Sequence, residues 1–116
     1  MITQLKGRIA EEKALNYLKG EGLQWVLSNY ACPLGEIDLI MRKGKTTAFV
    51  EVKARATHDA GVGSVTPRQA KRISQAAAIW MARDKIAAQS FCRFDIVAVN
   101  AYFWPTHIEN AFWGDR

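Results

Sequence analysis

A two-residue turn between two runs of aliphatic and β-branched residues constrains this chain more than any other feature. Residues 36–41 and 46–53 each have the composition of a β-strand. The link between them suits a type II′ turn, which wants glycine at its first central position, here Gly44. The sequence therefore predicts a β-hairpin, and the turn fixes its register so that Asp38 lies opposite Glu51.

Two opposed carboxylates need a compensating charge. Directly opposed residues have Cβ atoms about 4.5–5.5 Å apart, and like charges at that distance are destabilising. Strand alternation places Asp38, Glu51 and Lys53 on the sheet face of Ile40 and Phe49, and predicts a core face made of Ile37, Leu39, Ala48, Val50 and Val52. Either a hard divalent cation such as Mg²⁺ holds the carboxylates, or the hairpin is an edge with a cross-strand salt-bridge ladder, in which Glu36 faces Lys53.

Helices are predicted on both sides of this hairpin in the sequence. Residues 4–19 have apolar side chains near helical spacing, at Ile9, Ala10, Ala14, Tyr17 and Leu18. Thr66 and Pro67 form a helix start, and the helix is expected to run to about residue 87 with a buried stripe of Ile73, Ala77 and Trp80.

Further strands complete a mixed sheet. Residues 24–30 and 93–99 are predicted strands, and a final short strand is expected to include residues 108–112. Because a long helix separates 46–53 from 93–99, these two strands are expected to be parallel. The predicted order is α-β-β-β-α-β-β, an α/β fold with a mixed β-sheet flanked by helices, in one domain over residues 1–116.

Composition excludes several classes of protein. At 116 residues and 49% hydrophobic content, the chain can bury a core without disulfide or metal support. It has no apolar run of the roughly 20 residues that cross a bilayer and no secretory pattern, so we expect a cytoplasmic protein without membrane contact. Cys32 and Cys92 are far apart and suit neither a disulfide framework nor a zinc site, so both are expected to be buried, reduced thiols.

Positive charge gathers in the middle of the chain. Between residues 42 and 72 there are eight basic and two acidic residues, a local net charge of +6 in a chain whose total is +5. Such a segment indicates a surface for a polyanion, or else an ordinary solvated face. The nucleic-acid-binding candidates are Arg42, Lys43, Lys45, Arg55, Arg68, Gln69, Lys71 and Arg72.

Several motifs together carry a family resemblance over nearly the whole chain. They are Gly7-xxx-Glu11, GEIDLI at 35–40, FVEVK at 49–53 followed by Arg55, Val65-Thr66-Pro67, RFDIV at 93–97 and HIENAF at 107–112. This combination resembles the YraN (UPF0102) family of proposed endonucleases, which is similar to archaeal Holliday-junction resolvases and to the restriction-endonuclease-like fold.

The resemblance implies a catalytic set of Glu11, Asp38, Glu51 and Lys53. Asp38 and Glu51 would hold Mg²⁺ or Mn²⁺ with the Val52 carbonyl, and Lys53 would orient or help deprotonate the attacking water. The implied activity is hydrolysis of DNA phosphodiesters, selective for branched or otherwise structured DNA rather than for sequence. A two-fold symmetric junction would suit a C₂ homodimer.

Two departures from the family pattern keep other functions open. Ala10 stands where glycine is common, and Gln69-Ala70 stands where a Lys-Gln pair is common; Glu12 also competes with Glu11 as the helix acid. The alternatives are a non-catalytic nucleic-acid-binding or scaffold domain and, more weakly, another Mg²⁺-dependent hydrolase such as a small phosphatase. His58 and His107 have no carboxylate partner at useful spacing, so surface or structural roles are expected for both.

Overall fold

The computed structural model describes residues 2–54 and 65–112. The helices are α1 (Ile2–Gly20), α3 (Pro67–Arg83) and the short α4 (Lys85–Ala88). The strands are β1 (Gln24–Cys32), β2 (Gly35–Lys43), β3 (Thr46–Ala54), β4 (Phe91–Val99) and β5 (Pro105–Ile108). No helix in the described part of the chain is long and apolar enough to span a membrane.

The five strands form one mixed sheet in the order β1-β2-β3-β4-β5. β3 and β4 are parallel, as predicted, and the other neighbouring pairs are antiparallel. The hairpin has the predicted register from Lys43 opposite Thr46 to Leu39 opposite Val50. The α/β fold class predicted from the sequence is thus confirmed, and the arrangement is consistent with a restriction-endonuclease-like fold.

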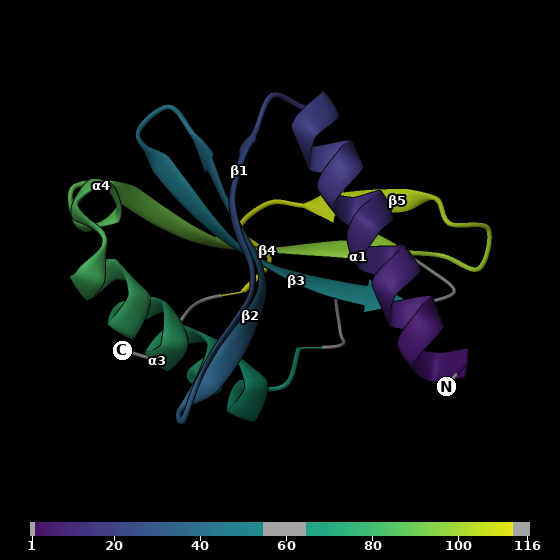
Figure 1. Cartoon of the computed structure of the whole chain (residues 1–116), viewed down its shortest axis with the longest axis horizontal. Helices are drawn as coiled ribbons and strands as arrows, with labels where there is room; N and C mark the ends of the chain where they lie inside the picture. Colours follow the sequence, from purple (N-terminus) through teal and green to yellow (C-terminus); the bar gives the residue numbers. More distant parts are fainter. Residues whose placement is uncertain (1, 55–64, 113–116) are drawn as a thin grey trace.

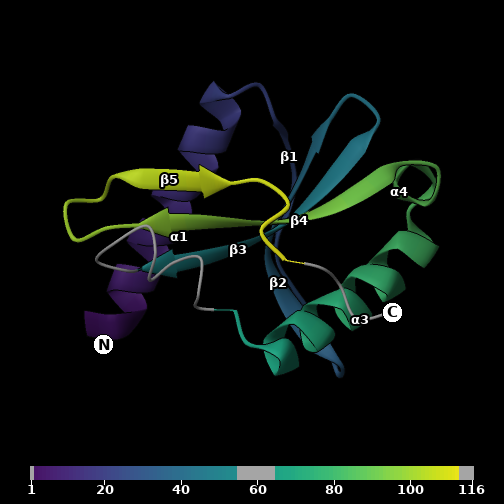
Figure 2. The ribbon, with the colours of Figure 1, turned by 180° about the vertical axis from the view of Figure 1, so that it is seen from behind.

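Each face of the sheet carries its own core, and Figures 1 and 2 show α1 and α3 on opposite sides of the strands. The α1 core contains Ala10, Ala14, Leu18, Leu39, Met41, Ala48, Val50, Val97 and Val99. The α3 core contains Ile37, Ile40, Phe49, Ile73, Ala76, Ala77, Trp80 and Ala87. Both helices therefore use most of the stripe residues that their sequence periodicity predicted, but Ile9 is only half-buried and lies outside the α1 core, and Tyr17 is 36% exposed.

The placement of Ile37 corrects the predicted strand alternation. We expected it on the face of Leu39 and Val50, but it packs in the α3 core with Ile40 and Phe49. The alternation fails close to Asp38, where the regular pairing of β2 with β3 ends. A local separation of two strands changes which face a side chain reaches, and a strict period of two does not anticipate it.

The start of α3 is fixed against β2. Thr66 caps the helix and its side chain accepts a hydrogen bond from the Gln69 backbone, while the Gln69 side chain accepts one from Thr66 at 3.0 Å. A Cβ placed on Gly35 would lie 2.4 Å from the Arg72 carbonyl oxygen. Only glycine lets the strand and the helix approach this closely, so Gly35 determines where the first turns of α3 lie.

Two predicted boundaries in the second half of the chain are wrong. The long helix ends at Arg83 rather than near residue 87, because Asp84 has an extended backbone and its side chain caps α4. The last strand is Pro105–Ile108, so of the expected residues 108–112 it includes only Ile108. It ends before Asn110, which has a left-handed φ of 54°, a conformation that does not continue a strand.

Both cysteines are free thiols, but neither is buried as expected. Cys32 is half-buried, and Cys92 is exposed near the start of β4. Burial increases along β4, from exposed Phe91 and Cys92 to the buried residues 95–99, so a small apolar side chain at the start of the strand does not reach the core.

Candidate functional site

The carboxylate of Asp38 interrupts the β2–β3 ladder. Asp38 Oδ2 accepts a hydrogen bond from the Val52 backbone N–H at 2.8 Å. In a continued register Val52 would pair with Ile37, but the regular pairs end at Leu39 and Val50. The Asp38 side-chain oxygen therefore accepts the hydrogen bond from the Val52 N–H, which a backbone carbonyl of β2 would accept in a regular ladder. This contact holds the half-buried Asp38 carboxylate between the strands instead of leaving it on an open face.

Glu51 interacts with this carboxylate, although the regular strand pairing from which we expected the contact ends one pair earlier, at Leu39 and Val50. Burial, a hydrogen bond to Asp38 and the negative charge of Asp38 together raise the pKa of Glu51 from 4.5 to about 9, and the positive charge of Lys53 opposes this rise. Protonation of Glu51 relieves the repulsion between the two carboxyl groups, and a bound cation would relieve it as well.

A third acid reaches the same place from α1. Burial is the main cause that raises the pKa of Glu11, followed by the negative charge of Asp38, while a hydrogen bond with Asn29 lowers it. Glu11 Oε1 is buried and has no hydrogen-bond partner in the described part of the chain. Glu12 is exposed, so Glu11 is the helix acid that faces the carboxylate pair.

Asn29 is a member of this group that the sequence did not reveal. It lies in β1 between residues that pair with Leu39 and Ile37, which places it across from Asp38. Its φ of 53° is left-handed, a conformation that asparagine tolerates better than most residues. The only available signal was an asparagine inside an otherwise regular strand, and that alone does not indicate a partner on another element.

A small pocket of about 150 Å³ opens beside the carboxylates. It is lined by Glu36 and Glu51 from the hairpin and by Gln69, Arg72 and Ile73 from α3. The close contact of Gly35 with Arg72 brings these helix residues to the sheet. The pocket therefore combines acidic oxygens with a guanidinium and an amide, groups that suit a cation and a phosphate side by side.

The donor set fits a hard divalent cation with an incomplete protein shell. Carboxylate oxygens suit Mg²⁺ and Mn²⁺, and Mg²⁺ commonly keeps waters and uses one or two carboxylates with substrate phosphate. A nearby cation would give the unpaired Glu11 Oε1 a partner and would offset the repulsion between Glu51 and Asp38. Within residues 2–54 and 65–112, however, no three His, Cys, Asp or Glu side chains form a ready metal-binding group.

Lys53 lies half-buried on β3 and acts on Glu51 through its charge. It makes no ion pair with Glu36 among the described residues, so the salt-bridge ladder offered as the alternative for the hairpin is not formed there. The roles of Lys53 and of the Val52 carbonyl in chemistry stay predictions.

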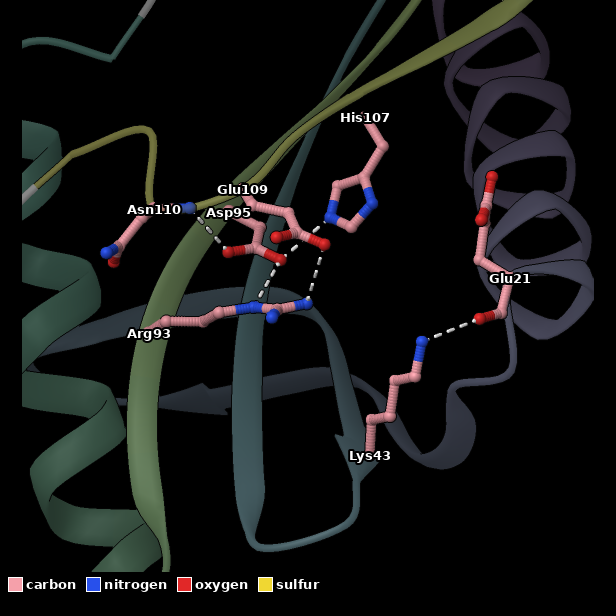
Figure 3. A network of polar contacts seen from close by, with 7 residues as sticks. All are labelled: Glu21, Lys43, Arg93, Asp95, His107, Glu109 and Asn110. Atoms are coloured by element: carbon pink, nitrogen blue, oxygen red, sulfur yellow. Dashed lines mark hydrogen bonds and ion pairs between the residues drawn. The ribbon is translucent and has the colours of Figure 1, made fainter.

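The basic candidates separate into two sets. Arg68, Lys71 and Arg72 are exposed on the first two turns of α3, next to the pocket. Lys45 is exposed at the hairpin turn, where Lys43 donates to the Glu21 carbonyl at 3.1 Å, a contact drawn in Figure 3. Arg55 and His58 lie outside the described residues.

Arg42 differs from the other basic candidates because its charge is already engaged. Its side chain is only 15% exposed and forms an ion pair with Asp84 at 3.5 Å. Asp84 also caps α4, so the pair joins the hairpin to the end of the long helix. The guanidinium of Arg42 is therefore less available to a phosphate than those of Arg68 and Arg72.

His107 does have a carboxylate partner, contrary to our expectation. Figure 3 shows the buried Asp95 accepting from His107 Nε2 at 2.8 Å, from Arg93 Nε at 3.0 Å and from the Asn110 backbone at 3.0 Å. Arg93 also lies 3.6 Å from Glu109. A fully buried carboxylate needs such partners, and here they attach β5 and the residues after it to β4. Sequence spacing could not find a pair on neighbouring strands.

The chain is similar in sequence to the proteins of one known family. Residues 10–99 match the sequence profile described as uncharacterised protein family UPF0102. The chain is 46% identical over 110 residues to a UPF0102 protein of Methylorubrum extorquens strain PA1, covering 95% of this chain and 86% of that protein. It is 42% identical over 117 residues to a UPF0102 protein of Legionella pneumophila subsp. pneumophila, covering 96% and 97%. None of these names states an activity.

Proposed function

The chain belongs to the UPF0102 family, and from the site that it carries we propose that it is a Mg²⁺- or Mn²⁺-dependent endonuclease that hydrolyses DNA phosphodiesters. The observation that supports this most is the contact between Asp38 and Glu51, which brings two carboxyl groups together beside a lysine and an arginine-lined pocket. The sequence resemblance described above points to the same reaction.

Each residue has a separate task in this proposal. Asp38 and Glu51 would hold the cation, and the Val52 N–H keeps Asp38 in place. When bound, the cation supplies a water of lowered pKa and neutralises charge on the phosphate oxygens. Lys53 adds a fixed positive charge beside the attacked phosphate, where negative charge accumulates during the reaction.

Glu11 and Arg72 act at the edges of the site. Glu11 Oε1, which is buried without a hydrogen-bond partner among the described residues, would accept a hydrogen bond from a water at the carboxylate pair. Arg72 and Gln69 line the pocket and would hold the DNA backbone, and exposed Arg68 and Lys71 extend that surface. Contacts to phosphate position a duplex but do not read its sequence, so we propose selection by DNA structure.

The test is a titration with Mn²⁺ followed by cleavage assays on branched and linear DNA, with Glu51→Gln and Glu12→Gln as a matched pair. Both variants remove one carboxylate, but Glu12 is exposed and outside the site. The proposal requires that Glu51→Gln loses metal binding and cleavage while Glu12→Gln keeps both. Equal behaviour of the two variants would refute the paired-carboxylate site.

A non-catalytic nucleic-acid-binding domain is the second candidate. It is favoured by the lack of a three-ligand metal group in the described residues and by Ala70 in place of the family glutamine. It predicts DNA binding that does not depend on metal, with no cleavage in Mg²⁺ or Mn²⁺. The same titration separates the two functions.

A further inference from the structure

The loop between β4 and β5 exposes an unusual amount of aromatic surface. Tyr102 is 82% exposed, Trp104 is 70% exposed and Phe103 is 37% exposed. Figures 1 and 2 show this loop extending beyond β4 and β5 at one end of the sheet. Single exposed apolar side chains such as Phe91 are ordinary, but three consecutive exposed aromatic residues are a candidate contact surface.

Hydrogen bonds hold these aromatic residues in one arrangement. Asn100 Oδ1 accepts from the backbone N–H of Tyr102 at 2.9 Å and of Trp104 at 3.0 Å. The Asn100 backbone N–H donates to the Trp104 carbonyl, and its carbonyl accepts from Phe103. Phe103 has a left-handed φ of 63°, which is rare for a bulky residue. The rings therefore project from a preorganised turn rather than from a loose one.

The loop lies at the same end of the sheet as Lys53. In the parallel pair, Lys53 is opposite Ala98, and Ala54 is opposite Val99, the last residue of β4. Glu51 is opposite Ile96. Asn100 is four residues beyond Ile96, so the loop begins roughly 13 Å along the strand direction from Glu51. That distance corresponds to about four nucleotides of a DNA strand at ~3.4 Å each.

We propose that Tyr102 and Trp104 form a stacking platform for unpaired bases of a DNA bound at the carboxylate site. This inference rests on the proposed function and specifies its substrate as DNA with exposed base faces, such as a gap, flap or branch. Base–aromatic stacking is independent of sequence because every base has a flat π-face. The rings are arranged on a narrow turn, whereas a protein interface needs a broad surface, and the +5 net charge of the chain favours a nucleic acid.

Binding to two matched DNAs tests the platform. One is a duplex with a central four-nucleotide gap, and the other is the same duplex fully paired, so that the ends contribute equally. Affinity is measured in a chelator to prevent cleavage, with wild type, the double variant Tyr102→Ser/Trp104→Ser and the control Phe91→Ser. Phe91 is 73% exposed and begins the same strand at its opposite end.

Wild type should bind the gapped DNA more tightly than the paired DNA. The double variant should lose about tenfold or more in affinity for the gapped DNA, because it no longer stacks on the unpaired bases. Its affinity for the paired DNA should change by less than about twofold. Phe91→Ser should behave as wild type. Tyr102→Phe/Trp104→Phe keeps both flat rings and should retain the preference, which separates stacking from hydrogen bonding and from loss of folding.

Three results would overturn the platform: no preference for the gap in wild type, an equal loss for both DNAs in the double variant, or an equal loss in Phe91→Ser. Sedimentation gives a further outcome. If the double variant forms smaller oligomers than wild type while its preference for gapped DNA is intact, the loop contacts a second copy of the chain instead. These outcomes do not bear on the nuclease proposal, which fails separately when wild type with Mn²⁺ cleaves no DNA.

Discussion

Asp38 Oδ2 lies 2.8 Å from the backbone nitrogen of Val52 and accepts its hydrogen bond. The contact gives the carboxylate two tasks, since one oxygen stabilises the opened hairpin and the group as a whole faces Glu51. The metal-binding function proposed for Asp38 can therefore be separated from its structural function by the choice of substitution.

Asp38→Asn should keep the fold and lose the metal, because an amide oxygen can still accept from Val52 but carries no charge. Asp38→Ala leaves the Val52 N–H without this partner, so it should lower the free energy of unfolding by about 1–3 kcal/mol. Urea unfolding in a chelator measures the difference between the two variants. Equal destabilisation by both would contradict the structural task assigned to the Asp38 oxygen.

Glu51→Gln should stabilise the metal-free protein. Because the folded pKa of Glu51 is about 9 against 4.5 when unfolded, the folded state holds a proton that the unfolded state releases, and stability falls as pH rises between these values. Glutamine removes this dependence, so the gain at pH 7 should be about 1–3 kcal/mol and should vanish below about pH 4. Thermal unfolding across pH provides the measurement.

Metal binding should release a proton. Because the Glu51 carboxyl is protonated below about pH 9 in the metal-free protein, Mn²⁺ must displace that proton, and its apparent affinity should rise by up to about tenfold per pH unit between pH 6 and 8. Calorimetry in buffers of different ionisation enthalpy counts the protons. A pH-independent affinity would show that the ion does not contact Glu51.

Lys53→Met should slow cleavage at least about a hundredfold while metal and DNA bind at near wild-type strength, because its charge matters most when the phosphate gains negative charge in the transition state. Metal affinity should stay equal or increase, since a repelling cation is removed. Single-turnover rates at saturating Mg²⁺ measure the effect. Cleavage within a few-fold of wild type would remove Lys53 from the chemistry.

DNA affinity should fall steeply with salt, and Arg72 should contribute more to this dependence than Arg42. Loss of one phosphate contact lowers the slope of log affinity against log salt by about 0.9. Arg72→Gln should show this change, whereas Arg42→Gln should leave the slope nearly unaltered because Arg42 is paired with Asp84. Fluorescence anisotropy over a salt series compares them, and identical slopes would contradict this assignment of phosphate contacts.

Local chemistry along the chain was sufficient for much of the fold. Gly44 defined the hairpin turn and hence the register down to Leu39 and Val50, and Thr66 with Pro67 defined the start of α3. These features depend on residues that are neighbours in the chain, and the conformational preferences of such residues follow from their amino-acid types. The same register predicted that Asp38 and Glu51 lie near each other, but the regular pairing ends before them, so the form of their contact depends on the opened hairpin.

The tertiary structure alone decided which distant groups meet. The break between β2 and β3 at Asp38, and with it the position of Ile37, depends on a side-chain oxygen displacing a backbone acceptor. Asn29 contacts Glu11, and His107 contacts the buried Asp95, each from a different helix or strand. Such contacts depend on how helices and strands pack in three dimensions, and neither spacing nor periodicity along a single chain contains that information.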